Sequence, residues 1–244
     1  MINDGINCTD NEIISFLMIG QSNMAGRGEL DEVEKIKNDM CYMLRMGRWQ
    51  PMSEPVNVDR AITGIRYHSG VSLATSFADM TAKHTGNKIG LIPCADGGTR
   101  LDQWMPGGIL FDHAVMMTKL ALRTSRLGGI IWHQGESDKQ NFDADTYRKN
   151  FIYMMNELRK AVGATELPLI VGELSENSVR YGEYASVFNE LLHSMKNEIH
   201  LYDVASSKGL ELKTDDLHFT SASCRELGKR YFEKYIQLAD ILSL

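Results

Sequence analysis

The segment IISFLMIGQSNMAGRG (residues 13–28) places an apolar run of strand length directly before a polar, glycine-rich turn. The run Ile13–Ile19 lacks a strict alternation of polar and apolar residues, which is typical of a strand covered on both faces. Four later runs have the same character, namely Lys88–Cys94, Gly129–His133, Leu167–Glu173 and Ile199–Asp203. Because longer amphipathic stretches separate them, the chain is predicted to form β-α units around a parallel sheet.

Apolar residues recur at helical spacing between these runs. The stripes fall within residues 111–122, 151–162, 187–195 and 227–238, so we expect a helix over each of them. Either Thr220 or Ser221 can serve as the N-cap of the last helix. The segment from Arg27 to His68 has only weak periodicity and is predicted to form loops around the entrance of a site.

The composition limits the classes of partner. The 244 residues carry 26 Lys and Arg against 32 Asp and Glu, a formal net charge of −6, and the basic residues do not cluster. We therefore expect no nucleic-acid partner and no patch for a membrane surface. No apolar run approaches the length needed to span a bilayer. The length and the absence of a linker-like stretch predict one domain over residues 1–244.

Two features bear on the compartment. The N-terminal sequence MINDGINCTDNE (residues 1–12) lacks the basic and apolar regions of a secretory signal. Cys8, Cys41, Cys94 and Cys224 show no C-x-x-C pairing, so free thiols are favoured over a disulfide pair. We therefore expect a cytoplasmic protein, unless a signal has been removed from this sequence.

The residues that follow each apolar run are the first candidates for a site, because ligands bind at the carboxyl ends of the strands in an open parallel sheet. Ser22, in GQSNMAGRG (20–28), lies on a tight strand-to-helix turn, where its hydroxyl is exposed and its backbone amide can face an oxyanion. The alternatives are a helix N-cap and a phosphate-binding loop, but the turn lacks the Lys of a P-loop.

Two further loops supply candidate hydrogen-bond donors. The segment ADGGTRLDQW (95–104) holds paired glycines, which let the backbone approach a ligand closely, although such a pair also suits an ordinary turn. In WHQGESD (132–138), the amide of Gln134 can donate to an oxyanion. Glu136 can orient neighbouring loops through charge-assisted hydrogen bonds.

The segment TDDLHFT (214–220) carries a candidate base with its own carboxylate. Asp215 lies three residues before His218 and can accept its Nδ1–H within one loop, which leaves Nε2 free to take a proton from a serine hydroxyl. Asp216 and Glu136 are the rival carboxylates for this role. An acidic pair before a helix N-terminus also has a purely structural explanation.

Together these motifs resemble those of the SGNH hydrolases, in particular the sialic-acid-specific acetylesterases and carbohydrate esterase family six, which includes acetylxylan esterases. The resemblance rests on GQSNMAGRG at 20–28, GGT at 97–99, WHQGESD at 132–138 and DDLHFT at 215–220. It covers nearly the whole chain in the right order. It implies a flavodoxin-like α/β fold, a three-layer α/β/α sandwich with a mostly parallel five-stranded sheet.

Carried over by position, the resemblance also implies roles. Ser22 is the nucleophile, His218 is the general base, and Asp215 is the acid that holds His218. The oxyanion hole would be formed by three donors: the Ser22 amide, Gly98 (or its neighbour Gly97) and Gln134.

The activity implied is that of a serine esterase that removes acetyl or other small acyl groups from a carbohydrate, such as an acetylated xylo-oligosaccharide or sialic acid. Polar and aromatic loop residues are the candidates to line the sugar pocket: Arg27, Arg66, His68, Arg100 and Trp104. The seven histidines show no metal-ligand spacing, so we predict no metal and no cofactor. The alternatives are a lipase or thioesterase acting on longer acyl chains, and a catalytically silent carbohydrate-binding protein. The oligomeric state stays open.

Overall fold

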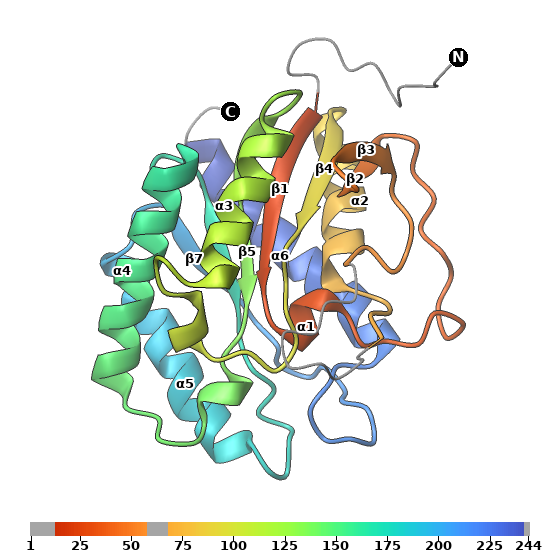
Figure 1. The fold of residues 1–244 in the computed structure, drawn as a ribbon. Coiled ribbons are helices and arrows are strands. Elements are labelled where there is room, and N and C mark those ends of the chain that lie inside the picture. Colours follow the sequence, from red (N-terminus) through yellow and green to blue (C-terminus); the bar gives the residue numbers. More distant parts are fainter. Residues whose placement is uncertain (1–12, 58–67, 242–244) are drawn as a thin grey trace, which may run out of the picture.

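The computed structural model describes residues 13–57 and 68–241, which form one seven-stranded sheet with helices on both faces (Figure 1). The strand order is β3-β2-β4-β1-β5-β6-β7. Neighbouring strands run parallel except β2 and β3, which pair antiparallel at one edge. The strands are β1 (Ile13–Gly20), β2 (Cys41–Arg45), β3 (Arg48–Pro51), β4 (Lys88–Pro93), β5 (Arg126–His133), β6 (Leu169–Gly172) and β7 (Tyr202–Ala205).

The helices cover the sheet in two outer layers, as the three-layer prediction requires. Helices α2 and α6 lie on one face, and α3, α4 and α5 lie on the other (Figure 1). The helices are α1 (Ser22–Ala25), α2 (Leu73–Thr85), α3 (Ile109–Ala121), α4 (Ala144–Val162), α5 (Gly182–Ser194) and α6 (Ser221–Ile241). Three short 3-10 turns complete the list, namely η1 (Leu101–Trp104), η2 (Glu136–Asp138) and η3 (Met195–Asn197).

Central strands β1 and β5 are buried on both sides by aromatic contacts. On one face, the Phe16 ring meets Phe77 of α2 and Tyr235 of α6, each at 4.9 Å between ring centroids. On the opposite face, Trp132 of β5 meets Trp104 at 5.3 Å. These edge-to-face pairs contribute about 0.5–1.5 kcal/mol each beyond the burial of their area. They fix the strands whose carboxyl ends carry the polar loops.

The prediction of five strands is wrong by two, because a hairpin lies inside the segment 27–68 that was expected to form loops. Strands β2 and β3 are joined at Met46 and Gly47, whose φ angles of 51° and 75° give the left-handed turn that suits the twist of a hairpin. The Trp49 ring packs over Gly90 of β4, where a Cβ would come within 2.6 Å of the indole. The hairpin thus extends the sheet by tertiary packing rather than by a long apolar run.

The four expected helices are confirmed, and Thr220 is the N-cap of α6, since its Oγ1 accepts the Ser223 amide at 3.2 Å. Helix α2 was not expected. It starts after Ser72, whose Oγ accepts the Ala74 amide at 3.2 Å. Its buried face carries small residues because α2 and α6 approach closely, and a Cβ on Gly228 of α6 would lie 2.0 Å from the α2 backbone.

Three of the four cysteines lie in the described part of the chain. Cys41, Cys94 and Cys224 are buried free thiols, as expected, whereas Cys8 and the N-terminal segment 1–12 lie outside the described residues. Within residues 13–57 and 68–241, no helix combines the length and the apolar character needed to cross a membrane.

The carboxyl end of β1 depends on Gly20. Its φ is 126°, and a Cβ there would lie 2.1 Å from the backbone oxygen of His133. We predict that Gly20→Ala costs more than about 3 kcal/mol of folding free energy or prevents folding, because backbone atoms of both central strands must move. The control is Gly86→Ala, at φ 68° with open space around it. That change should cost about 1 kcal/mol, or roughly 2–4 °C in Tm. Equal melting temperatures for the two variants would contradict the prediction.

Candidate active site

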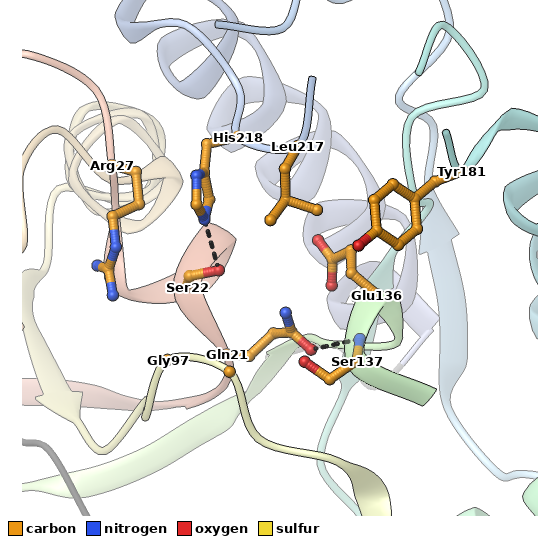
Figure 2. Close-up of a pocket in the computed structure, with 10 residues that line it drawn as sticks. Gln21, Ser22, Arg27, Gly97, Glu136, Ser137, Tyr181, Leu217 and His218 are labelled. Atoms are coloured by element: carbon orange, nitrogen blue, oxygen red, sulfur yellow. Dashed lines mark hydrogen bonds between the residues drawn. The ribbon is translucent and has the colours of Figure 1, made fainter. Parts of the chain in front are cut away.

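Polar loops from distant parts of the chain meet at the carboxyl edge of the sheet and enclose a cavity of about 170 Å³. Ser22 and His218 lie on one side of it, Glu136 and Tyr181 lie opposite, and Gln21 lies between them (Figure 2). The lining residues are Gln21, Ser22, Arg27, Gly97, Gly98, Glu136, Ser137, Tyr181, Leu217 and His218.

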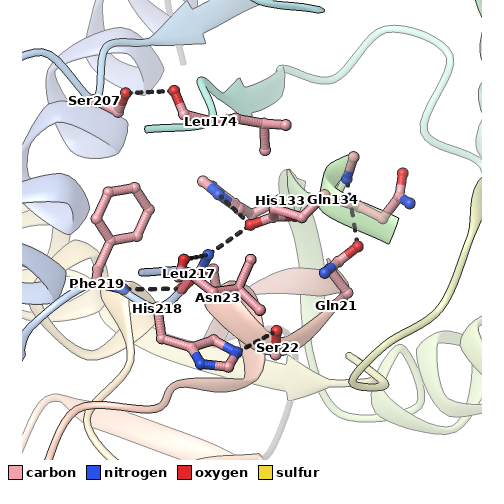
Figure 3. Close-up of polar contacts among 12 residues, drawn as sticks. Gln21, Ser22, Asn23, His133, Gln134, Leu174, Ser207, Leu217, His218 and Phe219 are labelled. Carbon is pink, nitrogen blue, oxygen red and sulfur yellow. Dashed lines mark hydrogen bonds and ion pairs between the residues drawn. The ribbon is translucent and has the colours of Figure 1, made fainter. Parts of the chain in front are cut away.

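A chain of hydrogen bonds joins a hydroxyl, an imidazole and a carboxylate at this edge. The Nε2 atom of His218 lies 2.9 Å from Ser22 Oγ (Figure 3). Its Nδ1 lies 2.7 Å from Asp215 Oδ2. The other Asp215 oxygen accepts the backbone amides of Leu217 at 3.0 Å and His218 at 2.9 Å. A carboxylate held in this way accepts Nδ1–H, so that Nε2 carries the lone pair that faces the serine.

The protonation of His218 and Asp215 follows from their surroundings. Burial lowers the pKa of His218 below its ordinary value of 6.5, and nearby Arg27 and Lys213 act in the same direction, while Asp215 raises it. For Asp215, partial burial raises the pKa, but hydrogen bonds from the amide and ring of His218 and from the Leu217 amide outweigh this, so the pKa is lowered. The imidazole is therefore neutral and the carboxylate ionised at neutral pH.

Asn23 holds the histidine loop against the serine turn. Its Nδ2 donates to Glu136 Oε1 at 2.5 Å and to the Leu217 carbonyl at 3.3 Å, and its Oδ1 accepts the Phe219 amide at 3.2 Å. The residues on both sides of His218 are therefore tied to the residue that follows Ser22. This is the local reason why the imidazole faces the hydroxyl.

The two rival carboxylates do not reach His218. Asp216, at φ 59°, turns away and accepts the amides of Val179 and Arg180, each at 2.9 Å. Glu136 lies across the cavity, bonded to Asn23, and burial raises its pKa to about 7. Of the three carboxylates considered from the sequence, only Asp215 lies beside the imidazole.

The structure does not direct the Gln134 side chain toward Ser22, as the expected oxyanion role would require. Both hydrogens of its Nε2 are used, because Nε2 donates to the Thr99 carbonyl at 3.0 Å and to a carboxylate oxygen of Asp138. Its Oε1 accepts the Tyr147 hydroxyl at 3.0 Å. Gln134 is buried beneath the cavity and its amide is turned away from Ser22 (Figure 3). Neither hydrogen of Gln134 Nε2 is therefore left to donate to an oxyanion.

The glycine pair does reach the cavity. Both Gly97 and Gly98 line it, and a Cβ on Gly97 would lie 3.7 Å from the Cβ of Ser22 and 2.6 Å from the guanidinium of Arg27. Gly98 adopts φ 75°, a left-handed conformation that favours glycine. The choice between their two amides as oxyanion donor therefore stays a prediction.

Among the expected sugar-pocket residues that the structure describes, Arg27 alone lines the cavity. Trp104 does not line the cavity. It is 1% exposed, packs in the core and donates Nε1–H to Thr99 Oγ1 at 3.1 Å. Arg100 is also misplaced, since it pairs with Asp102 at 2.6 Å beside a separate groove. His68 is exposed and does not line the cavity. Arg66 lies outside the described residues.

Sequence reasoning missed four lining residues: Gln21, Ser137, Tyr181 and Leu217. Three of them lie inside or beside quoted motifs, so their neighbourhood was a usable signal. Tyr181 had none, because it reaches the cavity from the loop between β6 and α5, where no motif was identified.

Comparison with known proteins identifies the family of this chain. A family model described as carbohydrate esterase, sialic acid-specific acetylesterase (SASA), matches residues 13–237. A probable carbohydrate esterase of Arabidopsis thaliana, At4g34215, is 31% identical over 241 residues, with 91% of this chain and 89% of the plant protein covered. The X-ray structure of that plant protein superposes with a TM-score of 0.80 at 28% identity, covering 93% of this chain and 98% of the other.

A second solved structure, that of NanS, has a TM-score of 0.73 at 16% identity and covers 94% of this chain and 98% of its own, which supports the fold alone. The fold and the polar edge define an SGNH-type α/β hydrolase. The chain belongs to the sialic acid-specific acetylesterase family of carbohydrate esterases, and it is a carboxylic ester hydrolase.

The hydrogen bonding of His218 predicts how its ring titrates. We expect a ring pKa below 6.5, because burial and the neighbouring cations disfavour the imidazolium. In Asp215→Asn the pKa should fall further, since the carboxylate is the group that raises it. NMR of the ring protons against pH measures both values. An unchanged or higher pKa in the variant would contradict the arrangement.

Proposed function

We propose that the protein hydrolyses acetyl esters of a carbohydrate through a Ser22–His218–Asp215 triad and an acyl-enzyme. The observation that carries the proposal is the continuous hydrogen-bonded chain from Asp215 through His218 to Ser22 Oγ at the wall of a cavity. Membership of a carbohydrate esterase family supports the reaction class.

In the first half of the reaction, Ser22 Oγ attacks the ester carbonyl while His218 Nε2 takes the hydroxyl proton. The ionised carboxylate of Asp215 stabilises the imidazolium that forms. His218 then gives this proton to the departing sugar oxygen, leaving the acyl group on Ser22. Water repeats the sequence, with His218 as base, and releases the acid and the free serine.

The size of the cavity favours a small acyl group. Its volume of about 170 Å³ is close to the roughly 150 Å³ that accommodates a benzene-sized molecule. An acetyl group fits within such a space, whereas most of a long acyl chain would extend beyond the half-open cavity. The lining also carries Arg27, Glu136 and the Tyr181 ring, groups that suit the hydroxyls and faces of a sugar.

Substitution of the adjacent residues Asp215 and Asp216, one at a time, tests the triad. Asp215→Asn should lower kcat by about 10⁴, because an Asn holds the imidazole in the wrong tautomer. Asp216→Asn should lose far less, since Asp216 faces the loop at 178–180 and not His218. Ser22→Ala should remove several orders of magnitude. The measurement is kcat on 4-nitrophenyl acetate. Full activity in Ser22→Ala, or a larger loss in Asp216→Asn than in Asp215→Asn, would refute the assignment.

Substrate size and chemistry can be tested on the unmodified protein. We predict that kcat/KM for 4-nitrophenyl acetate exceeds that for the octanoate ester by roughly tenfold or more, because the longer chain does not fit the cavity. Acetate release should also be detectable from an acetylated sugar. Acetylated xylo-oligosaccharides and O-acetylated sialic acids are the two panels to compare. A preference for octanoate would favour a lipase or thioesterase, and no turnover of any ester would favour a silent binding protein.

A further inference from the structure

The loss of Gln134 from the expected oxyanion hole leaves the site short of a side-chain donor, and Gln21 has the properties of one. It precedes Ser22 on the same turn, lines the cavity and is 2% exposed. Its backbone is fixed on both sides, because its amide donates to the His133 carbonyl and its carbonyl accepts the amides of Met24 and Ala25.

Two hydrogen bonds decide which end of the Gln21 amide faces the cavity. Its Oε1 accepts the backbone amides of Ser137 at 3.3 Å and Gly135 at 3.5 Å. Both partners are donors, so the oxygen must face them and the NH₂ group must face the other way. Nε2 accordingly points into the space between Ser22 and Glu136 (Figure 2).

The donor end of Gln21 is unused. Among the described residues, none accepts a hydrogen bond from Nε2, although the side chain is almost completely buried. Nε2 itself is accessible from the cavity, where a ligand or a water can accept its hydrogen bond. In Gln134, by contrast, the same group has two acceptors, Thr99 and Asp138. The two glutamines thus have opposite orientations relative to the serine.

We propose that Gln21 Nε2, and not Gln134, donates a hydrogen bond to the oxyanion that forms when Ser22 attacks the ester. This rests on the proposed Ser22 mechanism. The oxyanion develops beside Ser22 Oγ, within the space that Nε2 faces. Because the amide is oriented before substrate arrives, it can stabilise the developing charge without reorganisation. Gln21 is therefore a catalytic residue in the sense that it contacts a reacting atom.

The experiment uses an isosteric substitution. Gln21→Glu keeps an oxygen for the amides of Ser137 and Gly135 but replaces the donor with an acceptor, and Gln21→Met removes both functions without adding charge. We expect kcat on 4-nitrophenyl acetate to fall by about 10²–10³ in each variant, with KM close to that of the unmodified protein. Tm should stay close to that of the unmodified protein in Gln21→Glu and should fall in Gln21→Met, which leaves the amides of Ser137 and Gly135 without their acceptor. Gln140→Glu, at an exposed position, controls for the added charge.

A role that is only structural makes a different prediction. If Gln21 merely holds the loop at 135–137, Gln21→Glu should retain kcat, because both loop contacts are preserved. If the added charge acts only by raising the pKa of His218, the pH profile of Gln21→Glu should shift to higher pH and reach the unmodified plateau. Either result would overturn the proposal.

Gln134→Met completes the comparison. We expect it to lower Tm, since it leaves Asp138, Thr99 and Tyr147 without a buried partner, while losing far less kcat per folded molecule than the Gln21 variants. A loss of kcat confined to Gln134→Met would reverse the assignment. Ser22→Ala separates the two hypotheses: if it is inactive while Gln21→Met retains kcat, only the Gln21 inference fails.

Discussion

The geometry of the site depends on the hydrogen bonds of one buried side chain, Asn23. Its amide and carbonyl make hydrogen bonds to Glu136, to the Leu217 carbonyl and to the Phe219 amide, and it is 3% exposed. An Asn side chain has two donor hydrogens, so both are used here. The three contacts connect the end of β1, the loop after β5 and the loop before α6. Breaking this side chain would leave several buried polar groups unpaired, so the geometry around His218 is enforced by desolvation as well as by the bonds themselves.

The burial of Glu136 in this arrangement disfavours its ionised form. Burial raises its pKa to about 7, although the Asn23 hydrogen bond opposes the shift. The nearby His133 ring, 3.8 Å away, has its pKa lowered by burial to about 3, so it is neutral and forms no true ion pair. A second polar network, built on Gln134, Asp138 and Tyr147, lies beside the first. Buried networks of this kind rigidify the loops that carry a site, which explains why a conspicuous polar residue in a motif can be structural rather than catalytic.

Fold and site features could be predicted from the sequence where the residues that determine them lie within one short segment. The strand before Ser22 and the pair Asp215–His218 were predictable because each lies within one short segment whose spacing sets its geometry. The hairpin at Met46 and Gly47 was missed because it extends the sheet through packing on β4. Gln134 was misassigned for a related reason. The direction of an amide is set by tertiary partners, and no spacing along the chain reveals that Asp138 and Thr99 accept both of its hydrogens.

Two consecutive carboxylates connect the loop that carries His218 to the wall of the cavity. Asp215 holds His218, while Asp216, at φ 59°, directs its carboxylate to the amides of Val179 and Arg180 and to the Ser178 hydroxyl. That hydroxyl in turn accepts the Tyr181 amide at 2.9 Å, so the ring that faces Ser22 across the cavity is anchored to the loop that positions the imidazole. The left-handed turn at Asp216 lets the two consecutive carboxylates reach different partners. In this chain, therefore, a substitution in the loop at 178–181 changes one wall of the cavity and also acts on the segment that holds His218.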